Sequence, residues 1–269
     1  MTRFQDYGRH EFKYVLPLSQ RDRVLALIAE FAIPDPHARA RDDGRIGYHN
    51  HSIYLDTPEL LDYHERLDER KLRNRLRVRT YGFPGQRQVV FLENKRKLDN
   101  WVVKQRVPVG HADAWAAWEH DRPWIDLVRE IEGRGQYAAE HFVRLVEQGR
   151  NPVSAVHYFR EAYVPRDDDP DSKVRLTLDQ EVVGTIRPDG RALYAAPDVE
   201  LLPQDWMVME MKYSADRPAW MRMLCREMGL RALPVPKYGL SVARGLRAKY
   251  KREVRQLMPG PILELGWCA

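Results

Sequence analysis

Charged side chains at alternate positions are the residues of this sequence best placed to do chemistry. In Arg75-Leu-Arg-Val-Arg79 a strand would put the three arginines on one face, because successive side chains of a strand point to opposite sides. The same spacing recurs in Glu93, Lys95 and Lys97, in Glu11 and Lys13, in Lys104 and Arg106, in Tyr158 and Arg160, in Arg175 and Thr177, and in Glu210 and Lys212. Arginine and lysine fixed in this way are suited to binding phosphate groups.

The sign of these charges bears on what such a face would bind. Two like charges about 7 Å apart along a strand repel by roughly 2–2.5 kcal/mol at an effective dielectric constant of about 20. One solvated face of an antiparallel sheet is the ordinary source of such alternation, and it stands as one explanation here. The face is mainly basic, however, so an anion would offset the repulsion. If the sheet closes into a barrel, its charged lumen would suit a slender, extended anion such as a run of linked phosphates.

Two carboxylates stand out against this basic background. Glu11 and Glu210 each precede a lysine by two residues. Each could be a salt-bridge partner, or each could hold Mg²⁺ or Mn²⁺, which prefer carboxylate oxygens together with substrate phosphates. His49 and His51 could also ligate a metal, but no third ligand accompanies them, and we expect them on a strand or loop surface.

The amino-acid composition limits the kinds of function that the chain could have. The chain has 269 residues and a formal net charge of +5, with a pI near 9.1, which suits an anionic partner without identifying it. Its two cysteines, Cys225 and Cys268, form neither a disulfide framework nor a zinc motif. There is no signal peptide and no run of about 20 apolar residues, so we expect a cytoplasmic protein that a partner could recruit to the inner face of a membrane. Glycine-rich phosphate loops and acyl-transfer motifs are absent, and nucleic acid is not an expected partner.

The elements that must position these residues follow from the hydrophobic periodicity. Predicted strands cover Arg9–Leu16, Tyr48–Leu55, Leu72–Tyr81, Gln88–Arg96, Trp101–Val107, Ser154–Val164, Val174–Leu178 and Trp206–Lys212. Predicted helices run from Gln20 to Phe31 with Ser19 as cap, from Thr57 to Arg66, from about residue 216 or 218 to Gly229, and from about Lys237 to Arg252. Two or three more helices would occupy residues 112–149, with Trp115, Trp118 and Trp124 in their core. We therefore expect one α+β domain over residues 1–255 with a helical insertion at about 112–149, and a C-terminal tail over residues 256–269.

An ordered set of short motifs runs through the chain. The pieces are Arg9-His-Glu-Phe-Lys-Tyr14, Tyr54-Leu-Asp-Thr57, Leu76-Arg-Val-Arg-Thr-Tyr-Gly82, Phe91-Leu-Glu-Asn-Lys95, Tyr158-Phe-Arg160, Val174-Arg-Leu-Thr-Leu-Asp179, Val208-Met-Glu-Met-Lys212 and Pro236-Lys-Tyr238. In this order the chain resembles the VTC domain of polyphosphate polymerases, which belongs to the triphosphate tunnel metalloenzyme superfamily together with the CYTH proteins. The resemblance extends from about Arg9 to Gly245.

The resemblance implies an eight-stranded antiparallel tunnel barrel with peripheral helices, and an enzyme that transfers the γ-phosphoryl group of ATP to a polyphosphate chain. It implies Mn²⁺ or Mg²⁺ as cofactor, with Glu210 as metal ligand and Glu11 at the matching acidic position of the first strand. Catalytic phosphate contacts would come from Lys13, Arg77, Arg79, Lys95, Lys104, Arg160 and Arg175. Further phosphate-binding residues would be Arg75, Lys97, Tyr158, Lys212 and Lys237.

The sequence also departs from the family pattern. The family's Lys-Phe/Tyr-Ser-Lys run reads Lys237-Tyr-Gly-Leu240 here, and Lys97 stands where a histidine can occur. Hydrolysis of triphosphate, nucleoside triphosphate or polyphosphate in the same tunnel is therefore an alternative, and a non-catalytic polyphosphate-binding module is a second one. A separate membrane protein could be a partner, and no oligomeric state is implied.

Overall fold

The alternating segments form the strands of one antiparallel sheet in a computed structural model, which describes residues 10–82, 89–98, 101–111, 137–166, 174–186, 193–194, 197, 199–214 and 216–247. The strands are β1 (His10–Pro17), β2 (Ala32–Pro34), β3 (Arg39–Ala40), β4 (Ile46–Asp56), β5 (Leu72–Arg73), β6 (Leu76–Tyr81), β7 (Val89–Leu98), β8 (Trp101–His111), β9 (Asn151–Pro165), β10 (Arg175–Ile186), β11 (Val199–Glu200) and β12 (Trp206–Tyr213). The helices are α1 (Arg21–Ile28), α2 (Leu61–Leu67), α5 (Tyr137–Glu147), α6 (Ala219–Glu227) and α7 (Lys237–Arg247).

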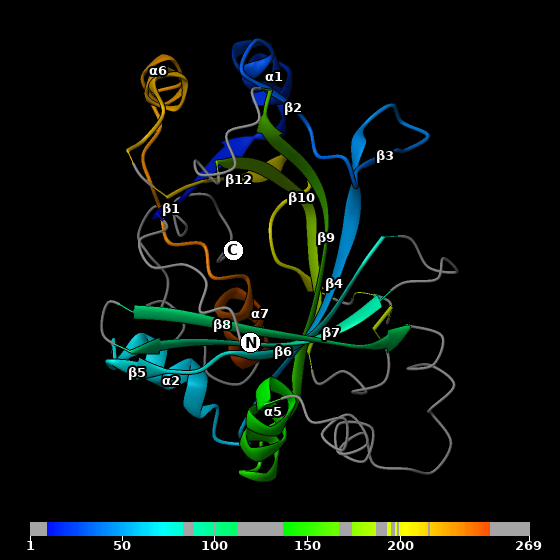
Figure 1. Ribbon diagram of the computed structural model, residues 1–269, viewed down its shortest axis with the longest axis vertical. Coiled ribbons are helices and arrows are strands. Elements are labelled where there is room, and N and C mark those ends of the chain that lie inside the picture. The colour runs from blue at the N-terminus through cyan, green and yellow to red at the C-terminus, as the bar shows by residue number, and fades with distance from the viewer. Residues whose placement is uncertain are drawn as a thin grey trace.

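The longer strands pair in the order β1-β12-β10-β9-β4-β6-β7-β8, and every pairing is antiparallel. Figure 1 shows β6, β7 and β8 running across the direction of β4 and β9, so the sheet is strongly twisted and curls around a central space. This confirms the predicted α+β class and the antiparallel sheet, in which eight long strands of the twelve-stranded sheet that the structure describes follow the predicted tunnel arrangement. Among the described residues no ladder joins β1 to β8. Residues 231–236 lie along β1 instead, where the Leu233 N–H donates to the Lys13 carbonyl oxygen at 2.8 Å.

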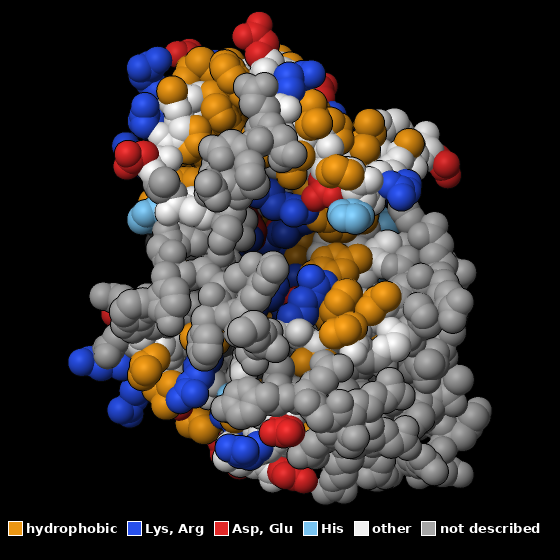
Figure 2. Space-filling view, viewed as in Figure 1, with side chains coloured by type: hydrophobic (Ala, Val, Ile, Leu, Met, Phe, Trp, Pro, Cys, Tyr) orange, Lys and Arg blue, Asp and Glu red, His pale blue; other side chains and the backbone are white. Residues whose placement is uncertain are grey.

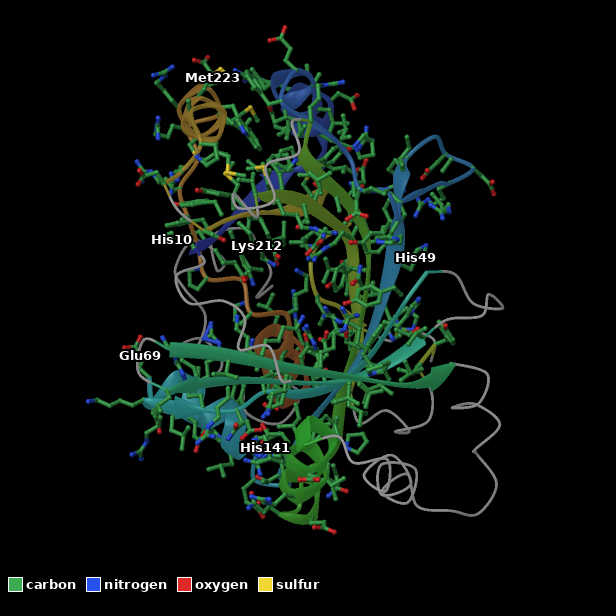
Figure 3. All side chains as sticks on the ribbon, in the orientation of Figure 1. His10, His49, Glu69, His141, Lys212 and Met223 are labelled. Atoms are coloured by element: carbon green, nitrogen blue, oxygen red, sulfur yellow. The ribbon has the colours of Figure 1, made fainter. Side chains whose placement is uncertain are left out.

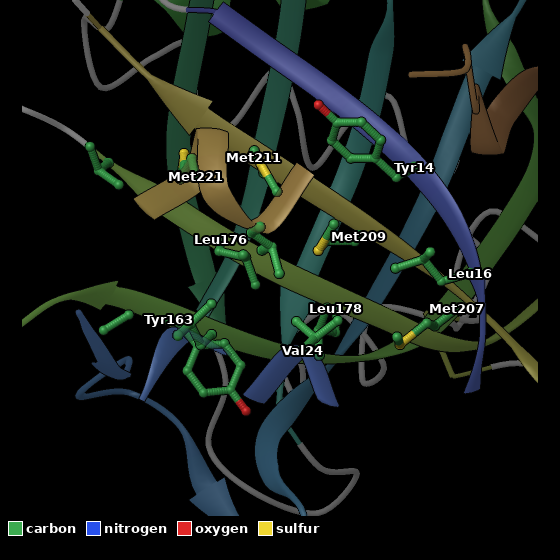
Figure 4. Close-up of a cluster of buried hydrophobic side chains, with 14 of the residues drawn as sticks. Tyr14, Leu16, Val24, Tyr163, Leu176, Leu178, Met207, Met209, Met211 and Met221 are labelled. Carbon is green, nitrogen blue, oxygen red and sulfur yellow. The ribbon is translucent and has the colours of Figure 1, made fainter. Parts of the chain in front are cut away.

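Apolar side chains cover the outside of the curl, which leaves the alternate residues facing inward. Figure 4 shows one outer cluster, in which Leu176, Met209 and Met211 pack beneath α1 and α6. A second outer cluster brings Phe142 of α5 against Leu92 of β7. Because strand side chains alternate, burying these residues outside directs their charged neighbours to the inside.

Helix α7 is the exception, because it packs against the inner face. Its Tyr238, Leu240 and Val242 belong to one buried cluster with Tyr54 of β4 and Tyr158 of β9. This helix therefore fills part of the curl with apolar side chains, and the remaining inner surface belongs to the charged residues.

Three local predictions were wrong at their boundaries. Ser19 does not cap a helix, because residues Leu18–Gln20 form a 3-10 turn and α1 begins only at Arg21. The second helix begins at Leu61 instead of Thr57, after Leu60 adopts a left-handed φ of 59°, and the Thr57 hydroxyl accepts the Leu61 N–H at 3.1 Å. The predicted strand over residues 72–81 is interrupted between β5 and β6.

Other boundaries agree with the sequence. Helix α6 ends before Gly229, whose φ of 59° is the left-handed conformation expected of a C-terminal glycine. Helix α5 lies within the predicted insertion. The tryptophans of that insertion, at residues 115, 118 and 124, lie outside the described residues, as do Cys268 and the predicted tail over residues 256–269.

Candidate functional site

The inner face of the curled sheet collects every residue that the sequence predicted for the site. The strand registers place Lys13 opposite Glu210, Arg175 opposite Lys212, and Lys95 opposite Lys104. The other predicted strand residues share this face by alternation, namely Glu11, Arg75, Arg77, Arg79, Lys97, Tyr158 and Arg160. Lys237 joins them from the first turn of α7. Figure 2 shows basic side chains inside a hollow between the two halves of the sheet, and Lys212 is labelled beside that hollow in Figure 3.

Glu210 is the centre of one cluster of charges on this face. Its carboxylate is nearly buried, and its Oε1 lies 3.4 Å from the Nζ atoms of both Lys13 and Lys237. Its Oε2 lies 3.1 Å from Lys212 Nζ and 3.3 Å from Arg160 Nη2. Burial opposes ionisation, but these cations outweigh it and hold the pKa of Glu210 well below its usual range. All four distances exceed the 2.7–2.9 Å of a strong charge-assisted hydrogen bond, taken as a rough guide.

Asp179 belongs to the same cluster, and sequence reasoning gave it no role. It is fully buried and accepts Arg160 Nε at 2.5 Å on Oδ1 and Lys237 Nζ at 2.5 Å on Oδ2. Burial alone would lower the pKa of Lys237, but Asp179 and Glu210 raise it above its usual value. The sequence did hold a signal, since Asp179 follows Thr177 by two residues on the same strand face.

Glu93 is the centre of a second cluster, formed by β6, β7 and β8. Its buried carboxylate lies 2.5 Å from Arg77 Nη2, 3.2 Å from Lys104 Nζ and 3.3 Å from Arg106 Nε. Burial opposes ionisation here too, and the neighbouring cations hold the pKa of Glu93 far below its usual range. Nearby, Arg79 Nε donates to Ser52 Oγ at 2.8 Å. Glu93 and Asp179 therefore add two buried acids to the face on which Glu11 and Glu210 stand out in the sequence.

A third group of cations is not neutralised in this way. Within the described ranges Arg75, Lys95 and Lys97 have no carboxylate within salt-bridge distance. Lys95 keeps an exposed side chain, but desolvation by the surrounding walls of the curl, together with nearby cations such as Arg75, lowers the pKa of this lysine to about 8. Arg175 differs from this group, because it contacts Asp35 and the Tyr48 hydroxyl.

Glu11 lies at the edge of the Glu210 cluster. Its carboxylate is 3.2 Å from Lys13 Nζ and 3.7 Å from Lys212 Nζ. Burial opposes ionisation, but Lys212 and Lys13 outweigh it and lower the pKa of Glu11 to about 2. The two predicted metal residues, Glu11 and Glu210, are therefore both ionised at neutral pH and bridged by the same lysines.

The histidines lie on the opposite face of the sheet. His51 is buried rather than at a strand surface, and its Nδ1 lies 2.6 Å from Nδ1 of His157. Burial lowers the pKa of His51 to about 3 and that of His157 to about 4, so both rings are neutral near pH 7. This pair has no access to the charged inner face.

Comparison with known proteins adds an independent line of information. A family model described as the VTC domain matches residues 8–245. Vacuolar transporter chaperone complex subunit 4 of Schizosaccharomyces pombe is 25% identical over 233 residues, which cover 72% of this chain and 31% of that protein. The chain thus spans about a third of the length of this relative.

The chain is also similar to solved structures. One of them is that of a protein from Hippeastrum, described as an adenylyl cyclase with a dominant triphosphatase activity. The match has a TM-score of 0.43 at 15% identity and covers 88% of this chain and 96% of that one. Within the part of the chain that the structure describes, no helix is long and apolar enough to cross a membrane.

Proposed function

The chain belongs to the VTC domain family, and from that premise we propose that it is a metal-dependent phosphotransferase that moves the γ-phosphoryl group of ATP to a polyphosphate chain. The observation that carries the proposal is the inner face itself. Rows of arginine and lysine from seven strands surround a small number of buried carboxylates, and several of these cations have no carboxylate partner among the residues that the structure describes. A linear run of phosphates is the anion whose shape and charge fit this surface.

Each part of the inner face would have a different role. Arg77 and Arg79 would bind phosphate oxygens, because guanidinium groups held by Glu93 and Ser52 present fixed donors. Arg160 and Lys237 would stabilise charge that develops on the transferring group, since Asp179 fixes both of them beside Glu210. Holding the reacting groups in line accounts for most of the catalysis in phosphoryl transfer.

The residues present also fit a divalent cation. Glu210 and Glu11 offer hard carboxylate oxygens whose nearest cations lie at 3.1 Å and 3.2 Å. Because no group of three His, Cys, Asp or Glu residues suited to a metal occurs among the described residues, substrate and water would have to complete the coordination. One or two carboxylates completed by substrate phosphates and water is the usual way in which proteins bind Mg²⁺ or Mn²⁺ with a phosphorylated substrate. Once bound, the ion would neutralise charge on the phosphates. Glu210 and Glu11 would hold it, and Lys13 and Lys212, which bridge the two carboxylates, would turn to the substrate.

Hydrolysis is the second candidate, and one observation favours it. Leu240 stands where the family has a second lysine, and its side chain is buried among Tyr54, Tyr158 and Tyr238. This position of α7 therefore offers no cation to an incoming chain end. Water would then replace the chain as acceptor in the same site.

Product analysis separates these candidates. Purified protein is incubated with ATP and Mn²⁺ or Mg²⁺, and the products are resolved on a polyacrylamide gel and assayed for free phosphate. Chains of increasing length support polymerisation, and free phosphate without chains supports hydrolysis. If the protein binds polyphosphate but forms neither product with any divalent metal, it is a binding module and the proposed transferase activity is wrong.

A further inference from the structure

A cavity of about 350 Å³ opens on the side of the curl where β1 approaches α2. One wall carries Glu11 and Lys13 of β1, another carries Arg66 of α2 and Arg75, and the third is formed by residues 232–236. The labelled Glu69, just after α2, marks this end of the molecule in Figure 3. Sequence reasoning gave Arg66 no role.

The cavity is continuous with the Glu210 cluster through one side chain. Lys13 Nζ lies 3.4 Å from Glu210 Oε1 and 3.4 Å from the Val235 carbonyl oxygen, so it borders both spaces. An extended ligand bound beside Glu210 would therefore pass directly from Lys13 into this cavity. The two spaces form one path along the inner face.

The charge balance of the cavity favours an anion. Arg66 and Arg75 have no ion pair with any described residue, and Glu11, the one acid among the lining residues, is already engaged by Lys13 and Lys212. Burial, together with the charges of Arg75 and Arg73, lowers the pKa of Arg66 to about 10. Burial is the main cause of this shift, and the neighbouring arginines add positive charge that an anion in the cavity would offset.

The remaining lining identifies the class of anion. The third wall consists of Ala232, Leu233, Pro234, Val235 and Pro236, which offer no charged side chain. Phe12 is the one aromatic residue of the lining, and its ring is stacked on Tyr213. The cavity therefore offers cations for phosphate groups and no free ring on which a nucleobase could stack.

We propose that this cavity, the Arg66 subsite, binds the distal phosphates of a linear polyphosphate whose reacting end lies at the Glu210 cluster. The inference rests on the proposed function of the inner face and adds a subsite that distinguishes long chains from short ones. A chain too short to reach from Glu210 past Lys13 gains nothing from Arg66. A longer chain gains one or more charge-assisted contacts.

The experiment compares binding of tripolyphosphate and of long-chain polyphosphate to the wild type and to Arg66→Gln, by calorimetry over a range of salt concentrations. In Arg66→Gln we expect the dissociation constant of the long chain to rise about tenfold relative to that of tripolyphosphate. This is the effect of losing one charged contact. The slope of the logarithm of the long-chain binding constant against the logarithm of the salt concentration should become shallower by about one, because one phosphate contact is lost. Arg66→Lys, which keeps the charge, should recover most of the loss.

Arg226→Gln is the matched control, because it removes the same charge from an exposed site on α6, at the far end of the molecule from α2 in Figure 1. If Arg66→Gln does not fold, Arg75→Gln, which removes the other arginine of the cavity lining, tests the same cavity. An unchanged ratio in the folded variant, or a loss equal to that of Arg226→Gln, overturns the subsite. If the wild type binds long chains through Arg66 but forms no chains from ATP, the proposed transferase activity is wrong while the subsite stands. A wild type that binds neither ligand overturns both.

Discussion

Two buried glutamates on opposite faces of the same sheet show how differently this fold uses a carboxylate. Glu161, on the outer face, is fully buried and accepts Arg21 Nε at 2.7 Å, Arg21 Nη2 at 2.6 Å and the Tyr163 hydroxyl at 3.1 Å. Glu210, on the inner face, is equally enclosed, but its nearest cation lies at 3.1 Å and three others lie at 3.3–3.4 Å.

The difference separates a structural ion pair from a site. The acceptor positions of Glu161 are filled at short range by groups of the protein, so no ligand can compete for them. The cations around Glu210 stand further off, and Arg75 and Lys95 nearby have no carboxylate of their own among the described residues. An arrangement of long contacts with excess positive charge is stabilised when an anion enters, whereas the Glu161 arrangement is already complete.

The comparison predicts its largest effect at Glu210. Glu210→Gln should lower turnover by about 1,000-fold, because the neutral amide removes the principal carboxylate available to a divalent ion and several kcal/mol of transition-state stabilisation with it. The measurement is the steady-state rate of product formation from ATP at saturating metal. Circular dichroism and thermal melting would show that the variant is folded. A rate within tenfold of the wild type would remove Glu210 from the reaction.

Glu161 should show the opposite behaviour. Glu161→Gln breaks a buried ion pair and leaves Arg21 with only the exposed Asp22 as an acidic partner, so we expect a loss of about 3 kcal/mol in the free energy of unfolding. The rate per folded molecule should stay close to that of the wild type. Urea denaturation measures the first quantity, and an assay below the unfolding transition measures the second. If Glu161→Gln lowers the rate as much as Glu210→Gln does, the two faces do not divide structure from function.

The two faces also show which features of the site could be predicted from the sequence and which could not. Alternation at period two assigned Lys13, Arg77 and Glu210 to one face correctly, because the pleat of a strand fixes which side a residue occupies. The partners on other elements could not be predicted. Lys237 meets Asp179 across 58 residues of sequence, through the docking of α7, and that contact depends on tertiary packing rather than on local periodicity.

Two acids of the site, Glu93 and Asp179, received no role for the same reason. Glu93 was placed on the inner face but received no role, since its contacts to Lys104 and Arg106 require the register between β7 and β8. The Arg66 subsite depends on where α2 lies relative to β1, and local periodicity gives no information on the placement of a helix against a distant strand. Backbone conformation set a further limit, since nothing in the sequence indicates the left-handed Leu60 that delays the start of α2.

The smallest expected effect concerns Lys95, and it tests whether the unpaired cations of the inner face bind phosphate. Limited solvation and nearby cations lower its pKa to about 8, so Lys95 is mostly charged at pH 7 and mostly neutral at pH 9. The charged form binds an anion, and the affinity for tripolyphosphate should therefore fall by up to about tenfold between these pH values.

Lys95→Arg is the control for this effect, because arginine keeps its charge throughout the range. Tyr54 also titrates here, since Arg77 and Arg79 outweigh its burial and lower its pKa to about 8. It is present in both proteins, as is the protonation of the ligand, so the difference between the wild-type and Lys95→Arg profiles isolates Lys95. Identical profiles would mean that Lys95 does not contact the phosphates. A difference confined to pH values above 8 would show that an unpaired cation of the inner face, unlike Arg21 beside Glu161, is held ready for a ligand.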